Sequence, residues 1–309
     1  MKKLFLSLLI LSVFYTADAC PICGCGVGGF YIGLLPTYKS QFLGLRYGYS
    51  HYETRLNDDP TQFSHDYYRQ VELYGGVTLG KHWQVMGFLP YHFNHQITDD
   101  GVVDRNGLGD MSLLANYKLW ESSKLSKNNT SFHQEFWLGA GIKLPTGKYG
   151  VNFSDSTNNE LSDLLGDVNS QMGTGSTDFI FNMMYNIHFG MFGVNTTANY
   201  KVNTMNNSDF KYGDRLSINS FAYYQTKPIK KIYMAPNVGL LYEYTMPNHL
   251  AASKVQQTGG YVASASVGLD LNFTNITVGT NVQLPVAQDY AEGQTVQKVS
   301  GLVHVTYTF

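Results

Sequence analysis

Hydrophobic and polar residues alternate with a period of two along most of the chain, from about residue 38 onward. The segment Val299–Phe309 shows the pattern clearly, because Val303, Val305 and Tyr307 occupy one set of positions and residues such as His304 the other. This period places alternate side chains on opposite faces of a β-strand. An exposed aromatic residue at the end of the strand gains nothing from contact with water, but it suits a strand whose outer face meets hydrocarbon. The pattern predicts lipid-facing strands.

Twelve segments of this kind can be counted, and each has the roughly 9–11 residues that a tilted strand needs to cross a bilayer. They cover 41–52, 67–79, 83–93, 108–120, 131–144, 177–188, 191–203, 212–226, 232–245, 259–272, 276–285 and about 296–309. Connections after even-numbered segments are mostly short, and those after odd-numbered segments, such as 53–66, 94–107 and 145–176, are mostly longer and polar. Outer-membrane barrels have this alternation, whereas a β-sandwich has no reason for it.

An open sheet edge is not tolerated in lipid, so such a sheet must close on itself. We therefore expect an all-β fold, a transmembrane antiparallel up-and-down β-barrel of about twelve strands, over residues 37–309. Its expected location is the outer membrane of a Gram-negative bacterium, as a monomer in the lipid bilayer. The C-terminal pattern also resembles the signature of bacterial outer-membrane proteins, whose final Phe the barrel-assembly machinery reads, which implies that machinery as a partner during insertion.

The N-terminus has the pattern of a processing segment. Two lysines precede a short apolar run over 4–15, and the small residues Ala17 and Ala19 fit a cleavage site. We expect a signal peptide over 1–19 and a mature chain that begins at Cys20. A cysteine at that position also allows lipidation, although Ala17 stands where lipoproteins usually have Leu.

Composition agrees with a barrel. Charged residues make up 14% of the chain, against about 25% in an ordinary soluble domain. The 23 Tyr and 18 Phe residues suit aromatic girdles at both membrane interfaces. The net charge of −2 argues against nucleic acid as a partner.

The less apolar set of positions should face the lumen, and it carries charges of both signs. These residues are Arg46, Glu72, Asp110, Lys118, Glu135, Lys143, Lys201, Arg215, Glu243, Asp270 and Lys298. In one interpretation they pair with each other and hold a narrow barrel rigid. In the other they line a polar path for a small solute. Sequence cannot show distances, so both interpretations stay open.

Two motifs carry a family resemblance. The segments GLGDMSLLANYKLW (107–120) and FWLGAGIKLPTGKYG (136–150) pair a GxGD with an LPTG sequence. Together they resemble the outer-membrane family named for the phenol meta-cleavage pathway, related to FadL-like transporters. The resemblance implies a passive channel for a small, hydrophobic or aromatic molecule. It does not imply that this protein handles phenols.

All three cysteines, Cys20, Cys23 and Cys25, lie in the Gly-rich segment 20–36. Thiolates at this spacing could hold a soft metal such as Cu(I) or Zn(II), which would make the protein a metal-associated or structural barrel. Three thiols do not complete a tetrahedral site, and a disulfide beside a free or lipidated cysteine is the simpler reading in an oxidising compartment. No other cofactor is expected. The segment could plug the lumen, as N-terminal segments do in FadL-type channels, or cap the periplasmic mouth.

An enzyme is the rival from another class, because some twelve-stranded outer-membrane barrels are lipid hydrolases. Ser112 and His133 are the nearest candidates for a nucleophile and a base, but no recognisable motif surrounds them, and we expect no enzyme. His92 and His95 should lie on opposite faces of a strand. The acidic loop residues Asp58, Asp59, Asp99, Asp100 and Asp155 are expected to be solvated, and a role in binding divalent cations is unproven.

Overall fold

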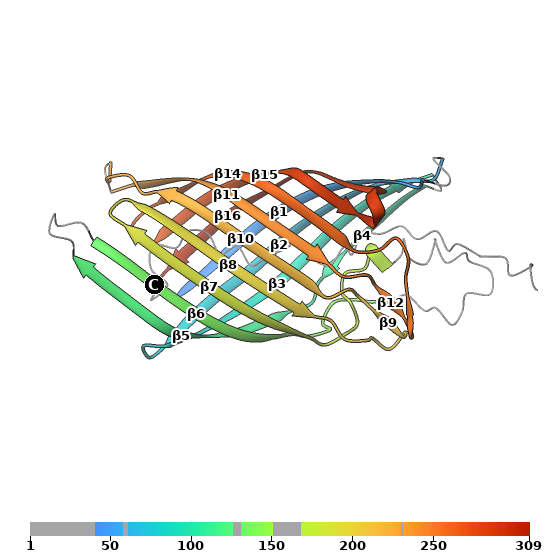
Figure 1. The fold of residues 1–309 in the computed structure, drawn as a ribbon, viewed down its shortest axis with the longest axis horizontal. Coiled ribbons are helices and arrows are strands. Elements are labelled where there is room, and N and C mark those ends of the chain that lie inside the picture. Colours follow the sequence, from blue (N-terminus) through green and yellow to red (C-terminus); the bar gives the residue numbers. More distant parts are fainter. Residues whose placement is uncertain (1–40, 58–60, 100, 126–130, 151–167, 230) are drawn as a thin grey trace, which may run out of the picture.

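The computed structural model describes residues 41–57, 61–99, 101–125, 131–150, 168–229 and 231–309, and their strands form one closed antiparallel barrel (Figure 1). The strands of the wall are β1 (Phe42–Arg55), β2 (Phe63–Leu79), β3 (Trp83–Thr98), β4 (Gly101–Leu108), β5 (Ser112–Leu125), β6 (Ser131–Lys143), β7 (Asp178–Phe189), β8 (Phe192–Val202), β10 (Arg215–Tyr224), β11 (Tyr233–Thr245), β14 (Gly260–Asn272), β15 (Ile276–Tyr290) and β16 (Thr295–Thr308). The short strands β9 (Phe210–Lys211), β12 (His249–Leu250) and β13 (Ser253–Lys254) form a separate sheet. β4 and β5 both pair with the same edge of β3, one after the other, and so together form one strand of the wall. The wall therefore has twelve strands, which confirms the predicted barrel of about twelve strands.

The barrel closes where the first and last strands meet. β1 pairs with β16 from Phe42 opposite Thr308 to Thr54 opposite Thr295, and its other edge pairs with β2. Pairing of β2 with β3 joins the remaining edges of the sheet. Each predicted segment overlaps a wall strand, so the period-two pattern located the wall correctly.

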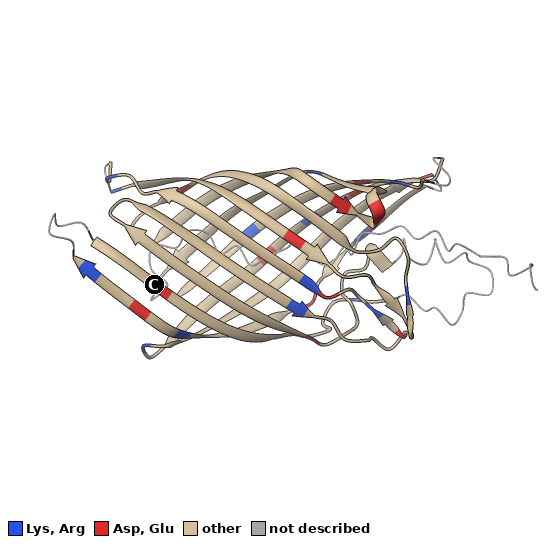
Figure 2. Cartoon of the chain, in the orientation of Figure 1, with Lys and Arg blue, Asp and Glu red and all other residues tan. Residues whose placement is uncertain are grey.

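The outer face of the wall is apolar, and the inner face is mostly polar. Leu45 is 54% exposed, whereas its neighbour Arg46 is 4% exposed. Figure 2 shows few charged residues along the strands, and many of them lie near the strand ends. A soluble protein rarely exposes an apolar patch larger than a few hundred Å², so this face fits contact with hydrocarbon. Among the described residues, no helix is long and apolar enough to cross a membrane.

The two ends of the barrel differ in their connections. One end, which we call the turn end, has short links such as Gly80–His82 and 190–191. The other, the loop end, has the long connections 144–177, 203–214 and 246–259. β1 begins at the turn end, and β16 returns to it.

Two segments expected as polar loops, 53–66 and 94–107, are largely strand instead. β1 and β2 continue pairing to Arg55 opposite Phe63, and β3 and β4 to Thr98 opposite Gly101. The prediction was wrong because alternation was taken as the only mark of a strand. Where a hairpin extends beyond the band of 9–11 residues that crosses a bilayer, both of its faces can be polar.

The wall strand formed by β4 and β5 is interrupted at 109–111. Pro90 on β3 lies opposite the interruption and has no N–H to donate, although its carbonyl accepts a hydrogen bond from the Gly109 amide (2.9 Å). β4 therefore pairs with residues Tyr91–Thr98 of β3, and β5 pairs with residues Trp83–Phe88. The break places Asp110 inside the barrel.

Candidate solute path through the barrel

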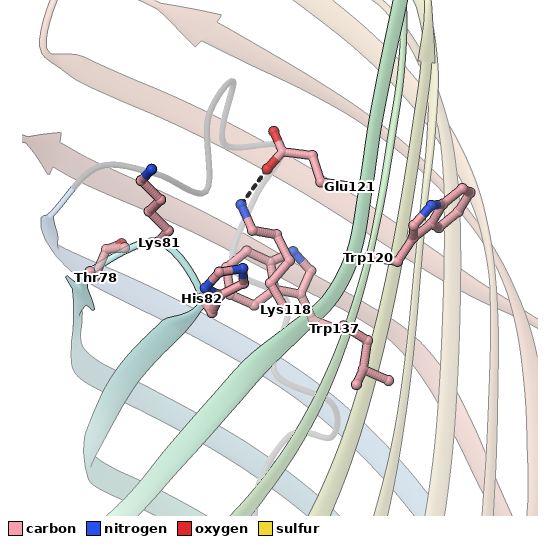
Figure 3. Close-up of a pocket in the computed structure, with 9 residues that line it drawn as sticks. Thr78, Lys81, His82, Lys118, Trp120, Glu121 and Trp137 are labelled. Atoms are coloured by element: carbon pink, nitrogen blue, oxygen red, sulfur yellow. Dashed lines mark hydrogen bonds and ion pairs between the residues drawn. The ribbon is translucent and has the colours of Figure 1, made fainter.

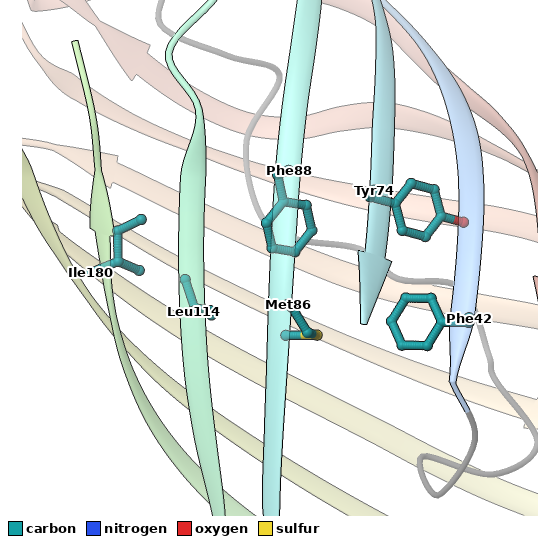
Figure 4. Packing of buried hydrophobic residues seen from close by; sticks show 6 residues of the cluster. All are labelled: Phe42, Tyr74, Met86, Phe88, Leu114 and Ile180. Carbon is teal, nitrogen blue, oxygen red and sulfur yellow. The ribbon is translucent and has the colours of Figure 1, made fainter. Parts of the chain in front are cut away.

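One part of the inner wall is apolar. Figure 4 shows the side chains of this part, which we call the apolar arc, side by side on neighbouring strands. Its members are Phe42 (β1), Tyr74 (β2), Met86 and Phe88 (β3), Leu114 (β5) and Ile180 (β7), and each is at most 4% exposed. They occupy the inward positions of their strands, so this part of the inner wall is an apolar cluster whose side chains are almost fully buried.

Glycines between these residues keep the lining flat. The Phe42 ring lies over Gly76, where an added Cβ would meet it at 2.6 Å. Leu114 lies over Gly141 in the same way, at 2.5 Å. The large side chains therefore lie along the wall above the glycines of the next strand, rather than pointing across the lumen.

The sequence pattern predicted a polar lumen, and the apolar arc was missed. One signal was available. Val85, Met86, Phe88 and Leu89 form an almost continuous apolar run on β3, and a run without alternation indicates a strand that is apolar on both faces.

A different part of the inner wall, on β7, β8, β11, β14 and β15, is lined by amides and hydroxyls. Asn182 donates to Asn199 (2.6 Å), and Asn281 donates to Asn237 (3.2 Å). Oδ1 of Asn182 and Nδ2 of Asn199 are buried and have no hydrogen-bond partner among the described residues. Buried amide atoms of this kind can bind a polar group of a solute or a water molecule.

Most predicted lumenal charges do lie inside the barrel, and they are paired. The ion pairs are Arg46–Glu72, Lys118–Glu121 (2.5 Å), Lys143–Asp110 (2.6 Å) and Arg215–Glu243 (2.8 Å), and Asp270 lies 3.6 Å from the His304 ring. Glu135 accepts a hydrogen bond from Asn186 (3.1 Å), and Lys201 lies in register with Arg215 on the inner face. The partners sit on the same or nearby strands rather than on opposite walls. This arrangement supports the interpretation in which charges brace the wall, and a part in a solute path stays a prediction.

Lys298 lies on the outer face, so its predicted lumenal position was wrong. The register between β1 and β16 shifts after Ser50, and two β16 residues, Lys298 and Val299, stand opposite the single residue His51. A bulge of this kind reverses the parity of the residues that follow. The Lys298 ammonium donates to Glu53 (2.8 Å) on the outside of the barrel.

Asp110, the acid of the GxGD motif, is the centre of a buried network at the loop end. Its carboxylate accepts hydrogen bonds from Lys143 Nζ (2.6 Å), the Gly147 amide (2.9 Å) and the Thr174 amide (2.9 Å). Lys143 also pairs with Asp178 (2.8 Å). Gly147 belongs to the LPTG motif, so the structure brings the two motifs into direct contact.

The backbone approaches Asp110 so closely that two glycines are required. An added Cβ on Gly173 would lie 2.5 Å from Asp110 Oδ1, and one on Gly147 would lie 2.8 Å from the Gly173 Cα. Thr146 completes the contact between the motifs, since its hydroxyl donates to the Gly109 carbonyl (3.0 Å). The two motifs thus join the interruption between β4 and β5 to the beginning of the long connection 144–177.

The end of that connection, Val168–Ser176, lies inside the loop end of the barrel, and we call it the inner segment. Its carbonyls are held from opposite walls: Tyr212, beside β10, donates to Val168 (3.0 Å), and Asn94 on β3 donates to Ser170 (3.2 Å). Most of its residues are buried. The inner segment therefore narrows the lumen at this end.

The turn end has an open pocket of about 470 Å³ (Figure 3). Lys118 lies 5.2 Å from the centre of the Trp137 ring, a cation–π contact, and pairs with Glu121. Trp137 Nε1 is buried without a hydrogen-bond partner among the described residues, and Lys81 and His82 stand beside it. The pocket combines an aromatic ring with several polar groups.

The hydrolase candidates do not meet. Ser112 pairs with Lys143 at one end of the β5–β6 ladder, and His133 pairs with Ser123 at the other, where the Ser123 hydroxyl lies 2.8 Å from His133 Nδ1. His92 is buried in the lumen, and His95 faces outward beside Asp104 (2.6 Å), so they lie on opposite faces as expected.

The predictions for the N-terminal region fall on residues that the structure does not describe. They concern the signal peptide 1–19, the segment 20–36 and the three cysteines. Asp58, Asp59, Asp100 and Asp155 also lie outside the described residues, and Asp99 is exposed at a turn.

Comparison with known proteins gives structural neighbours only. No family model matches the sequence, and no curated protein matches it. An outer-membrane channel from Pseudomonas putida F1 superposes with a TM-score of 0.60 at 14% identity, covering 92% of this chain and 100% of that one. The β domain of the Bordetella autotransporter BrkA gives a TM-score of 0.49 at 10% identity, covering 87% and 100%. The first likeness shows the fold of an outer-membrane barrel. The resemblance to the phenol meta-pathway family stays a prediction.

Proposed function

We propose that the protein is a passive channel in the outer membrane of a Gram-negative bacterium, for a small uncharged solute with a hydrophobic or aromatic part. The apolar arc is the observation that carries this proposal. Ions would gain nothing from six buried apolar or aromatic side chains facing inward, because a charged group is disfavoured in an apolar environment. An apolar solute, in contrast, is stabilised by about 25 cal/mol for each Å² that it buries against such a lining.

The rest of the lumen supports an uncharged solute. Arg46, Lys143 and Arg215 are paired with carboxylates, so a charged solute would have to compete with these existing partners. The part of the inner wall that is lined by amides offers a buried acceptor at Asn182 Oδ1 and a buried donor at Asn199 Nδ2, which have no hydrogen-bond partner among the described residues and could bind a single polar group. The P. putida neighbour is described as an outer-membrane channel, which agrees with this class of function.

The inner segment supports a channel that is narrow at the loop end. Transport would be driven by the concentration gradient of the solute, without ATP. The solute would pass the inner segment, move along the apolar arc, and leave at the turn end past Lys118 and Trp137.

The test is flux into liposomes that contain the purified protein, measured with two uncharged solutes of similar size, one aromatic and one a polyol. In the Phe88→Asn variant, the ratio of aromatic to polyol flux should fall by roughly three- to tenfold, because burying one CH₂ is worth about 0.8 kcal/mol. Phe221→Asn is the matched control, since Phe221 is also buried but belongs to a separate cluster with Ala235.

Two results would overturn the proposal. An equal fall of the flux ratio in both variants would show that the arc is not the selective surface. No flux of either solute, both in the whole mature chain and in a variant that lacks residues 20–36, would show that the barrel is not a channel.

A further inference from the structure

A cluster of three potential metal ligands lies on the outer face of the barrel, outside the solute path. Glu53 on β1 stands directly opposite His65 on β2. His51 precedes Glu53 by two residues, so its side chain lies on the same face of the strand. The neighbouring positions Tyr52 and Asp66 point inward, which places all three ligands outside.

The donor atoms converge on one point. His51 Nε2 and His65 Nδ1 lie 3.8 Å and 3.9 Å from the same oxygen, Oε1 of Glu53, and the three atoms all lie within 4.8 Å of one another. Ligands bound to Zn²⁺ at about 2.0–2.1 Å in a tetrahedral site are roughly 3.3 Å apart. Closing the cluster around an ion would therefore shorten the two nitrogen–oxygen distances by about half an ångström and the nitrogen–nitrogen distance, which is at most 4.8 Å, by up to about 1.5 Å.

His51 supplies an independent sign that a partner is missing. Its Nε2 is buried, and it makes no hydrogen bond with any residue that the structure describes. A buried polar atom without a partner is costly and calls for an explanation. A metal ion bound to this nitrogen would provide the partner.

The surroundings hold the ligands in place. The Tyr67 ring stacks on His51 with centroids 4.4 Å apart, and Phe63 contacts His65 edge-on at 5.5 Å. Lys298 donates to Oε2 of Glu53 and leaves Oε1 directed toward the histidines. Neighbouring contacts that fix the orientation of ligand side chains in this way are typical of metal sites. The bulge in β16 is what brings Lys298 to this face.

We propose that His51, Glu53 and His65 bind a divalent first-row transition metal ion of the Zn²⁺ class at the loop end of the barrel. Two imidazole nitrogens and one carboxylate oxygen suit such ions, whereas Ca²⁺ and Mg²⁺ prefer oxygen ligands alone. A neighbouring open pocket of about 450 Å³, lined by Glu53, His65 and Gln294 among others, gives an ion access and leaves room for water as a fourth ligand.

The experiment uses the folded protein in detergent, with Cys20, Cys23 and Cys25 replaced by Ser so that thiolates cannot bind the metal. Calorimetric titration with Zn²⁺ should show one site, and Co²⁺ should give the visible absorption of a bound ion. His65→Ala should weaken Zn²⁺ binding at least about tenfold, since ligand loss costs no less than loss of an outer-shell partner. Glu53→Gln should also weaken it, although Gln can keep its contact with Lys298.

His95→Ala is the matched control, because His95 is a nearby outward histidine that lies outside the cluster. It should leave Zn²⁺ binding unchanged, and all variants should show the same heat-dependent gel mobility as the parent. Absence of a Zn²⁺ site in the cysteine-free protein, or equal weakening by His65→Ala and His95→Ala, would overturn the proposal. Neither result would bear on solute flux, so this proposal and the channel can fail separately.

Discussion

Each end of the lumen has a buried lysine, and the two lysines have different partners. At the loop end, Lys143 lies between Asp110 and Asp178, and the side chains of all three are at most 8% exposed. At the turn end, Lys118 pairs with Glu121, whose side chain is 27% exposed, and packs on the Trp137 ring. The loop-end lysine is locked into a network that joins three parts of the chain, whereas the turn-end lysine borders open space.

This difference indicates which end of the barrel is fixed. Removing one member of a fully buried ion pair leaves an uncompensated charge, while the loss is smaller where the remaining partner, here Glu121 at 27% exposure, can be hydrated. The network around Lys143 therefore holds the inner segment in place. The pocket around Lys118 lacks such a network and is open to solvent.

The largest effect is expected for Lys143→Met, which leaves Asp110 and Asp178 buried without their cation. We expect a loss of about 3–5 kcal/mol in the free energy of unfolding, measured by urea titration in detergent. Lys118→Met is the control and should lose much less. Equal losses in the two variants would show that the two ends do not differ in the way described.

Asp110→Asn should have a smaller effect, because the amide keeps one acceptor oxygen and directs its NH₂ group at other donors. A loss of about 1–3 kcal/mol is expected from the unsatisfied groups. Hydrogen exchange should become faster in the inner segment and stay unchanged in β14 and β15. Unchanged exchange over 168–176 would mean that Asp110 does not anchor the segment.

Lys118→Gln should lower stability less than Lys143→Met does, because Glu121 is partly exposed and can be hydrated, but it should change ion selectivity. The turn end then carries one positive charge fewer beside Glu121, so the reversal potential in a KCl gradient should shift toward cation selectivity. A shift toward anions would contradict this placement of the pair.

A change in salt concentration should have the smallest effect on the two variants. Between 0.1 M and 1 M salt the Debye length falls from about 10 Å to about 3 Å. The selectivity change in Lys118→Gln should shrink over this range, while the stability loss in Lys143→Met should persist, because buried charges are poorly screened. If both vary alike with salt, the Lys143 network is open to solvent.

The sequence predicted the wall of the barrel well, because alternation depends only on neighbours along the chain. The sequence-based prediction failed where contacts between strands, rather than neighbours along the chain, determine whether a residue faces inward or outward. Lys298 was misplaced because a single extra residue in β16 reverses inside and outside, and such a bulge leaves little trace in composition. The long hairpins were called loops because polar strands show no alternation.

The candidate site could be predicted only in part. The motifs around Asp110 and Gly147 were recognisable, but their contact joins residues 37 positions apart and required the fold. The apolar arc is spread over five strands, and only its β3 portion was visible as a run. The metal ligands His51, Glu53 and His65 come together through the register of β1 with β2, which the sequence does not state.

The seam between β1 and β16 has a consequence for how the protein reaches its folded state. Thr54 and Thr295 hydrogen-bond across it, although 241 positions separate them in the chain. Contacts this remote are slow to form, since a long loop must first be closed. Until then the incomplete sheet exposes two unpaired edges, which attract other chains and promote aggregation. Refolding yield in vitro should therefore depend steeply on protein concentration.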